Sequence, residues 1–281
     1  KTAPVTKPVA KKSPTASENK AKTKLAELRK TRAGQQLSDF FGKLGLTILN
    51  PDAIEPKVEH QKLANAIWQG QRAGFDLMGD INSAIHRKTI HTVDWAQKTK
   101  AEKASITSLC GSLKKKKMIQ YEEHDNQIDI TPLDDKTNYI SGRWGEDVIL
   151  TRVLKVAALL NNKQDKPVCS VFRSIDYKKN GSDKWIDSEC DLVLVVNGKF
   201  YFIEVKTGKQ LNTEHYVEQV GHLEDKKEYS IYCCIDKEKA PEEIKSLCVK
   251  SNFAIFDFEH FDASLKALIT KRQSYSFETG K

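Results

Sequence analysis

The sequence has little that would mark a membrane or secreted protein. It contains no apolar run of about 18 residues, the length that a membrane-spanning helix needs. Its basic beginning lacks the apolar core of a signal peptide. The six cysteines include no CxxC pair and share no zinc-type spacing with the seven histidines. We therefore expect a cytoplasmic protein with reduced thiols and no membrane contact.

The excess of positive charge is confined to the beginning of the chain. The net charge is +8, and residues 1–32 contain ten Lys or Arg against two Glu, a surplus that equals the whole excess. The remainder is balanced, so net charge gives no reason to expect nucleic-acid binding by the folded part. We predict a disordered basic tail or linker over 1–34, which could join a further domain upstream and touch nucleic acid non-specifically.

Residues 35–90 have apolar side chains at helical spacing, as in Leu63, Ile67 and Trp68. We expect a helical region there whose role is packing, because the segment carries no recognisable chemistry.

Residues 91–142 resemble a winged helix-turn-helix module. Ser105 is expected to cap a helix with apolar positions at spacings of three and four, and the segments 119–122 and 127–131 can pair as a short wing. Lys114, Lys115, Lys116 and Lys117 follow at the helix end, where the helix dipole favours cations. Such a helix could enter a DNA groove, or the lysines could be a solvated end of a spacer or dimerisation module.

Residues 143–281 alternate between helix and strand patterns. We expect helices at 145–160, 212–223, 241–249 and 261–272, and strands at 168–175, within 186–207 as a pair, at 229–235 and at 253–258. This order predicts an α/β domain in which helices flank both faces of a mixed sheet.

The sharpest motif is a hairpin between Asp187 and Lys209. Asn197-Gly198 is a strong signal for a two-residue type I′ turn. With that turn, Asp191 lies opposite Glu204 and Glu189 lies opposite Lys206, and strict alternation puts all four side chains on one face. Both faces of the hairpin are otherwise apolar, so we expect it to be covered on both sides.

Two opposed carboxylates in an apolar setting repel each other unless a cation lies between them. Mg²⁺ or Mn²⁺ prefers such oxygen ligands. Lys206 could orient an attacking water, aid its deprotonation, or stabilise charge on a phosphoryl group. These are the parts of a phosphodiester hydrolase. The alternative is a structural ion-pair network, with Glu189 bound to Lys206 and Asp191 capping a backbone group.

The motif Asp191…Glu204-Val205-Lys206, within an α-β-β-β-α-β order, resembles the PD-(D/E)xK nuclease superfamily, which has the restriction-endonuclease-like fold. The resemblance implies Mg²⁺ or Mn²⁺ held by Glu146, Asp191, Glu204 and the Val205 carbonyl, with Lys206 assisting the attacking water. It also implies accessory roles for Tyr216 and Gln219. Cys190 stands where the family name has proline.

A narrower resemblance links residues 90–270 to the nuclease half of CRISPR-associated effectors. This resemblance rests on three segments: the winged segment, SGRWGEDVIL and the ECD…FIEVKTG hairpin. Those effectors have an upstream CARF domain that binds cyclic oligoadenylate, so the resemblance implies antiviral defence and a cyclic-nucleotide-sensing domain or partner. No such domain is recognisable in residues 1–90.

The leading hypothesis is therefore a metal-dependent endonuclease that acts on DNA or RNA and leaves a 5′-phosphate, as the family does. A Holliday-junction-resolvase-like or restriction-like preference is the nearest alternative, and a homodimer is expected. The second alternative is a non-catalytic winged-helix protein that binds DNA.

Overall fold

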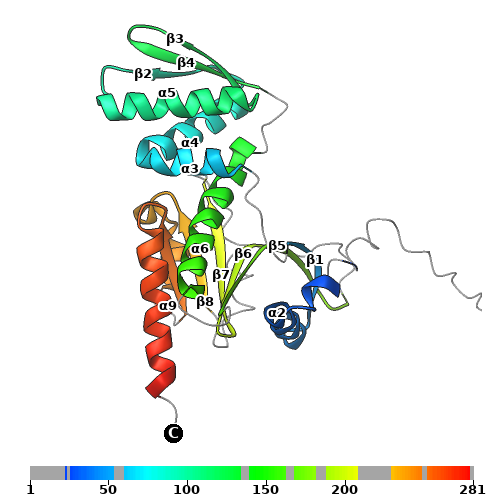
Figure 1. Cartoon of the computed structure of the whole chain (residues 1–281). Helices are drawn as coiled ribbons and strands as arrows, with labels where there is room; N and C mark the ends of the chain where they lie inside the picture. The colour runs from blue at the N-terminus through cyan, green and yellow to red at the C-terminus, as the bar shows by residue number, and fades with distance from the viewer. Residues whose placement is uncertain are drawn as a thin grey trace, which may run out of the picture.

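The computed structural model describes residues 23, 26–53, 60–133, 139–162, 168–181, 188–207, 229–248 and 252–278. The predicted helix at 212–223, with Tyr216 and Gln219, lies outside the described residues, as does most of the predicted basic tail. The described chain folds into a large sheet with helices on its faces and a smaller helical module with its own sheet (Figure 1).

The large sheet has six strands in the order β1-β5-β6-β7-β8-β9. The strands are β1 (Leu46–Ala53), β5 (Cys169–Lys179), β6 (Ser188–Val196), β7 (Lys199–Lys206), β8 (Tyr229–Cys234) and β9 (Phe253–Asp257). The pairs from β1 to β7 are antiparallel, and β7, β8 and β9 are parallel. The predicted mixed sheet flanked by helices is confirmed.

Helices cover both faces of this sheet. On one face lie α6 (Trp144–Asn161) and α9 (Phe261–Glu278), whose apolar residues share a core with Leu192, Leu194 and Ile203. On the other face α2 (Arg32–Lys43) packs against Phe200 and Phe202, and α8 (Glu242–Leu247) packs beside β8. Because both faces are covered, the strands read as nearly continuous apolar runs.

The region predicted to be only helical, 35–90, contains the edge strand β1. Leu46 and Ile48 are buried, and β1 pairs with β5 over residues far apart in the sequence. This strand was missed because its pairing, and not local periodicity, determines its structure. The ordered chain also begins before residue 35: Leu28 is buried, and the Thr31 hydroxyl caps α2 by accepting the Gly34 N–H at 3.0 Å.

The smaller module consists of α3, α4 and α5 with a three-stranded sheet in the order β2-β4-β3. Its elements are α3 (Gln61–Gln69), α4 (Gln71–Arg87), β2 (His91–Asp94), α5 (Lys100–Lys115), β3 (Ile119–Glu123) and β4 (Gln127–Pro132). The expected pairing of the last two segments is confirmed, since β3 and β4 are antiparallel neighbours.

The predicted cap of α5 at Ser105 is wrong. The cap is Thr99, six residues earlier, and the helix begins at Lys100. Thr99 and Glu102 form a reciprocal capping box in which Glu102 accepts the Thr99 N–H at 2.8 Å. Both Ser105 and Thr99 are of a type that caps helices, but only Thr99 has a glutamate three residues later.

One continuous apolar core joins the module to the large sheet. Phe75 of α4 lies 6.3 Å from Trp144 and 5.4 Å from Phe258, measured between ring centroids. Arg152 of α6 stacks on Trp68 of α3 at 4.3 Å and bonds Asp262 of α9. The beginning of α6 is therefore held between the module and the sheet. No helix of the described residues combines the length and apolar character of a membrane span.

Candidate active site

The β6–β7 hairpin has the turn and register that the sequence predicts. Asn197 and Gly198 have φ values of 50° and 76°, as a type I′ turn requires. The ladder runs from Val196 opposite Lys199 to Leu192 opposite Ile203. This register directs Asp191 and Glu204 to adjacent positions at the open end of the hairpin.

The ladder between β6 and β7 ends one pair before Asp191 and Glu204. There Asp191 Oδ2 accepts the backbone N–H of Val205 at 2.7 Å. A side chain thus replaces the backbone acceptor and ties β6 to β7 where direct strand pairing stops. The alternative interpretation of the motif, a structural ion-pair network, predicted that Asp191 caps a backbone group, but it did not specify Val205 as the partner.

The prediction of strict alternation along β6 needs a correction. Leu192 belongs to the core under α6, whereas Cys190 belongs to the core under α2, so the alternation reverses at Asp191. On β5 the reversal falls at Ser174, the residue between Arg173 and Ile175, and Ser174 has a positive φ of 48°. Sequence alternation could not reveal this reversal, because it depends on a backbone conformation that serine rarely adopts.

Glu204 and Lys206 lie at the end of β7. Glu204 is only 9% exposed, and one of its oxygens accepts a hydrogen bond from Lys206 Nζ. The other oxygen, Oε2, is buried and has no hydrogen-bond partner among the described residues. A buried carboxylate oxygen without a hydrogen-bond donor costs folding free energy, and a bound cation would offset this cost.

Glu146 and Asp147 lie in the first turn of α6, and Arg173 of β5 binds both. Arg173 Nη2 donates to Glu146 Oε2 at 3.1 Å, and Nη1 donates to Asp147 Oδ1 at 2.8 Å. Asp147 is fully buried and also accepts the backbone N–H of His60 at 3.2 Å. Glu146 remains partly exposed beside the other acids.

Gly145 lets α6 approach the end of β7. A Cβ atom at this position would lie 2.2 Å from Thr207 Cγ2 and 3.4 Å from Val205 Cγ1. No larger residue could stand there without moving the helix or Thr207. This close approach brings Glu146 to the carboxylates of the hairpin.

The acids of this cluster resist ionisation. Burial raises the pKa of Asp191 well above its ordinary value, and the charge of Glu204 raises it further. Burial likewise raises the pKa of Glu204 and of Glu146, against the opposing effects of Lys206 and Arg173 respectively. Burial alone would lower the pKa of Lys206, but Glu204 and Asp191 outweigh it and the pKa is raised.

The structure brings together the main residues selected from the sequence. The charges of Glu146, Asp191, Glu204 and Lys206 act on one another, and Glu189 acts on Glu146 and Glu204. Lys114–Lys117 lie at the other module, at the end of α5, where Lys114 stacks on Tyr121 at 5.0 Å. They are therefore not part of the acid cluster.

Sequence reasoning missed Arg173 and Asp147. Arg173 is 4% exposed, although it belongs to the apolar run VCSVFRSI. A charge inside such a run is a usable signal, because a buried arginine needs acidic partners. Asp147 was hidden beside Glu146 in the first turn of a helix, where acids are favoured in any case.

The donor set suits a hard divalent cation. Carboxylate oxygens are the ligands that Mg²⁺ and Mn²⁺ prefer, and the orphan Oε2 of Glu204 offers one of them. Among the described residues no three His, Cys, Asp or Glu side chains already surround a common point. Lys206 and Arg173 instead engage Glu204 and Glu146, so binding would require these side chains to adjust.

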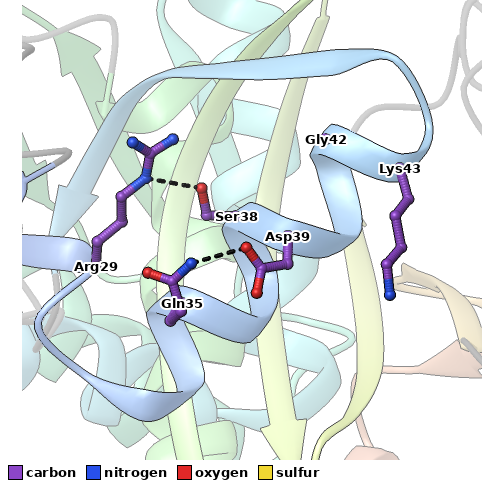
Figure 2. Close-up of a pocket in the computed structure, with 6 residues that line it drawn as sticks. All are labelled: Arg29, Gln35, Ser38, Asp39, Gly42 and Lys43. Atoms are coloured by element: carbon purple, nitrogen blue, oxygen red, sulfur yellow. Dashed lines mark hydrogen bonds between the residues drawn. The ribbon is translucent and has the colours of Figure 1, made fainter.

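A separate hollow lies along the outer side of α2 (Figure 2). It is lined by Arg29, Gln35, Ser38, Asp39, Gly42 and Lys43. Arg29 bonds Ser38 and Gln35 bonds Asp39 across it, so its polar groups largely satisfy one another. It is open and shares no residue with the acid cluster.

No protein-family model and no curated protein matches the chain. Five chains of solved structures match, and two of them share its fold at a TM-score above 0.5. One is protein VC1899 from Vibrio cholerae, with a TM-score of 0.52 at 15% identity, covering 84% of this chain and 60% of that one. The other is Can2 from Sulfobacillus thermosulfidooxidans in complex with cyclic tetra-adenylate, with a TM-score of 0.52 at 16% identity. It covers 82% of this chain, which thus spans about three fifths of each protein's length.

Proposed function

We propose that this chain is a metal-dependent endonuclease that hydrolyses phosphodiester bonds of DNA or RNA. The carrying observation is the largely buried cluster of Asp191, Glu204 and Glu146 beside Lys206, in which Glu204 Oε2 has no hydrogen-bond partner among the described residues. A core that had lost this function would have no reason to keep three acids whose burial and repulsion disfavour their charged forms.

Glu146, Asp191 and Glu204 would hold Mg²⁺ or Mn²⁺, with the Val205 carbonyl as a further ligand. The ion would lower the pKa of a bound water and neutralise charge on the phosphate. The Val205 N–H holds Asp191 in place, and β7 presents Glu204 and Lys206 at one end.

Lys206 acts as a hydrogen-bond donor and positive charge in this proposal. Its raised pKa keeps it protonated at neutral pH, so in this arrangement it orients the nucleophile and stabilises the developing phosphoryl charge. Its ammonium has three N–H groups and donates one of them to Glu204, so the other two could donate to substrate oxygens.

Substrate binding outside the acid cluster is proposed for the exposed lysines at the end of α5, Lys114–Lys117. No ion pair with an acid is found for them among the described residues, so they are available to phosphates. We further propose a role in antiviral defence with a cyclic-nucleotide-sensing domain or partner. Support comes from the motif resemblance and from the fold shared with Can2, which was solved with cyclic tetra-adenylate.

Plasmid nicking with Mg²⁺ or Mn²⁺ tests the proposal. Glu204→Gln and Lys206→Ala should each reduce the nicking rate by at least about 100-fold, because each removes a charged group from the reacting centre. The matched controls are Glu122→Gln on β3, where the side chain is exposed, and Lys245→Ala on α8, where the side chain is half-exposed and paired with Glu242; neither residue belongs to the cluster. These controls should nick like the wild type.

Equal nicking by all the variants would exclude an active site at this cluster. The non-catalytic alternative predicts a different result: retained DNA binding, measured by fluorescence anisotropy, with no metal-dependent nicking by the wild type. A homodimer is also proposed, and light scattering tests it. The junction-resolving alternative requires two active sites in such a dimer, and cleavage of a junction substrate distinguishes it.

A further inference from the structure

Arg173 connects a fully buried acid to an acid of the proposed active site. One guanidinium nitrogen binds Asp147, which is itself held by the His60 backbone, and another binds Glu146. Asp147 is inaccessible to a ligand, whereas Glu146 is partly exposed. The arrangement is thus asymmetric, with a fixed anchor on one side and on the other a carboxylate for which only Oε2 has a hydrogen bond from a described residue.

The alternation of β5 reverses directly after Arg173. Ser174 has a φ of 48°, and beyond it the strand's alternation is reversed. Phe172 and Ile175 both belong to the core under α2, whereas Arg173 points to the α6 side and contacts its first turn. Positive φ in serine is unfavourable, and such strain is concentrated at functional positions.

We propose that Arg173 is a positioning residue that holds the Glu146 carboxylate in the acid cluster, with Asp147 as its anchor. The inference rests on the proposed metal-dependent function. Arg173 makes one hydrogen bond to a single Glu146 oxygen, Oε2, and Oε1, which has no hydrogen bond from the part of the chain that the structure describes, could face a cation. An arginine suits this task because its planar fork makes two contacts in a fixed geometry.

Positioning and simple charge repulsion predict opposite results, which makes the role testable. If Arg173 acted only as a nearby positive charge, removing it would strengthen binding of a divalent cation. If it positions Glu146, removing it should weaken binding, as the loss of an outer partner of a metal ligand does, by about 10–100-fold.

The experiment is calorimetric titration of the full chain with Mn²⁺. Arg173→Met should bind Mn²⁺ at least about tenfold more weakly than the wild type. Arg173→Lys keeps the charge but cannot bridge both acids, so its affinity should fall as well. Asp147→Asn, which changes no proposed ligand, should also weaken binding by loosening the anchor.

Arg152→Met is the matched control. Arg152 is also a partly buried arginine, but it lies on α6 itself and binds Asp262 and Trp68. Its loss should lower the melting temperature and leave the Mn²⁺ affinity within about twofold of the wild type. Thermal unfolding of each metal-free variant shows whether it is folded. If Arg173→Met does not unfold cooperatively, the Mn²⁺ affinities of Arg173→Lys and Asp147→Asn test the positioning role.

Folded variants that bind Mn²⁺ as tightly as the wild type, or more tightly, would overturn the positioning role and leave the endonuclease proposal intact. A wild type that neither binds Mn²⁺ nor nicks plasmid would instead overturn the proposed function.

Discussion

At the residue scale, Asp191 is an acid whose charged form the fold disfavours. Its carboxylate is buried, lies near Glu204 and Glu146, and has Lys206 as its positive neighbour. Its pKa is raised, so the folded protein favours the protonated acid. The stability linked to that proton is complete at low pH and is lost as the pH rises through the raised pKa.

Asp191→Asn should therefore stabilise the metal-free protein at pH 8. The amide oxygen can still accept the Val205 N–H, while the unfavourable charge is gone. We expect a gain on the order of 1 kcal/mol, or about 2–4 °C in melting temperature, together with loss of nicking. Thermal unfolding in EDTA measures it, and the gain should shrink toward pH 4.

Asp129→Asn on β4 is the control of opposite sign. Hydrogen bonds from Thr92 and Gln127 lower the pKa of Asp129, so its charged form is favoured in the folded protein. This variant should be no more stable than the wild type at pH 8. A fall in melting temperature for Asp191→Asn would contradict the claim that the charge of Asp191 destabilises the metal-free protein.

At the element scale, the hairpin was predictable because its information is local. Asn197-Gly198 determines the turn, and the turn determines the register up to Leu192 and Ile203. The reversal at Asp191 was not predictable, because it arises where neighbouring strands meet and no residue type at 174 or 191 demands it. The helix α6 followed from its apolar period, whereas β1 depended on a distant partner.

The packing of α6 on β7 gives the element-scale prediction. Gly145→Ala would place a methyl group against Thr207 Cγ2 and push the helix away from the strand. We expect a melting temperature lowered by several degrees, corresponding to about 1–3 kcal/mol, and slower nicking because Glu146 moves with the helix. Differential scanning calorimetry and the plasmid assay measure the two effects.

Two further variants separate this clash from a general effect of alanine. Thr207→Ser removes Cγ2, so adding it to Gly145→Ala should restore part of the lost stability. Gly79→Ala in α4 meets no atom within 4 Å and should stabilise the protein slightly, since alanine favours helix. If Gly145→Ala behaved like Gly79→Ala, the close approach of α6 to β7 would be wrong.

At the scale of the whole molecule, the helices that cover the large sheet come from two parts of the sequence, one before the smaller module and one after it. The helices α6 and α9 cover one face, and α2, which precedes the module in the sequence, covers part of the other (Figure 1). Phe40 of α2 stacks on Phe200 at 4.9 Å and lies 5.7 Å from Phe202. The basic beginning of the chain and the covering helix are thus neighbours in sequence with different physical roles.

Two truncations separate these roles. Removing residues 1–25 takes away seven lysines and one glutamate but leaves Leu28 and α2. The melting temperature should stay within about 2 °C of the wild type, because no buried described side chain is lost. Removing residues 1–45 also deletes Leu37, Phe40 and Phe41, and the exposed aromatic face should bind a hydrophobic dye and aggregate.

Unlike stability, nucleic-acid binding should weaken on the shorter truncation. Losing seven lysines removes up to seven phosphate contacts, so the affinity for a mixed-sequence duplex should fall and its dependence on salt should become shallower. Fluorescence anisotropy at several salt concentrations measures both. If removal of residues 1–25 left the salt dependence unchanged, nucleic-acid contacts would have to come from the folded part, whose charges are balanced apart from local clusters such as Lys114–Lys117.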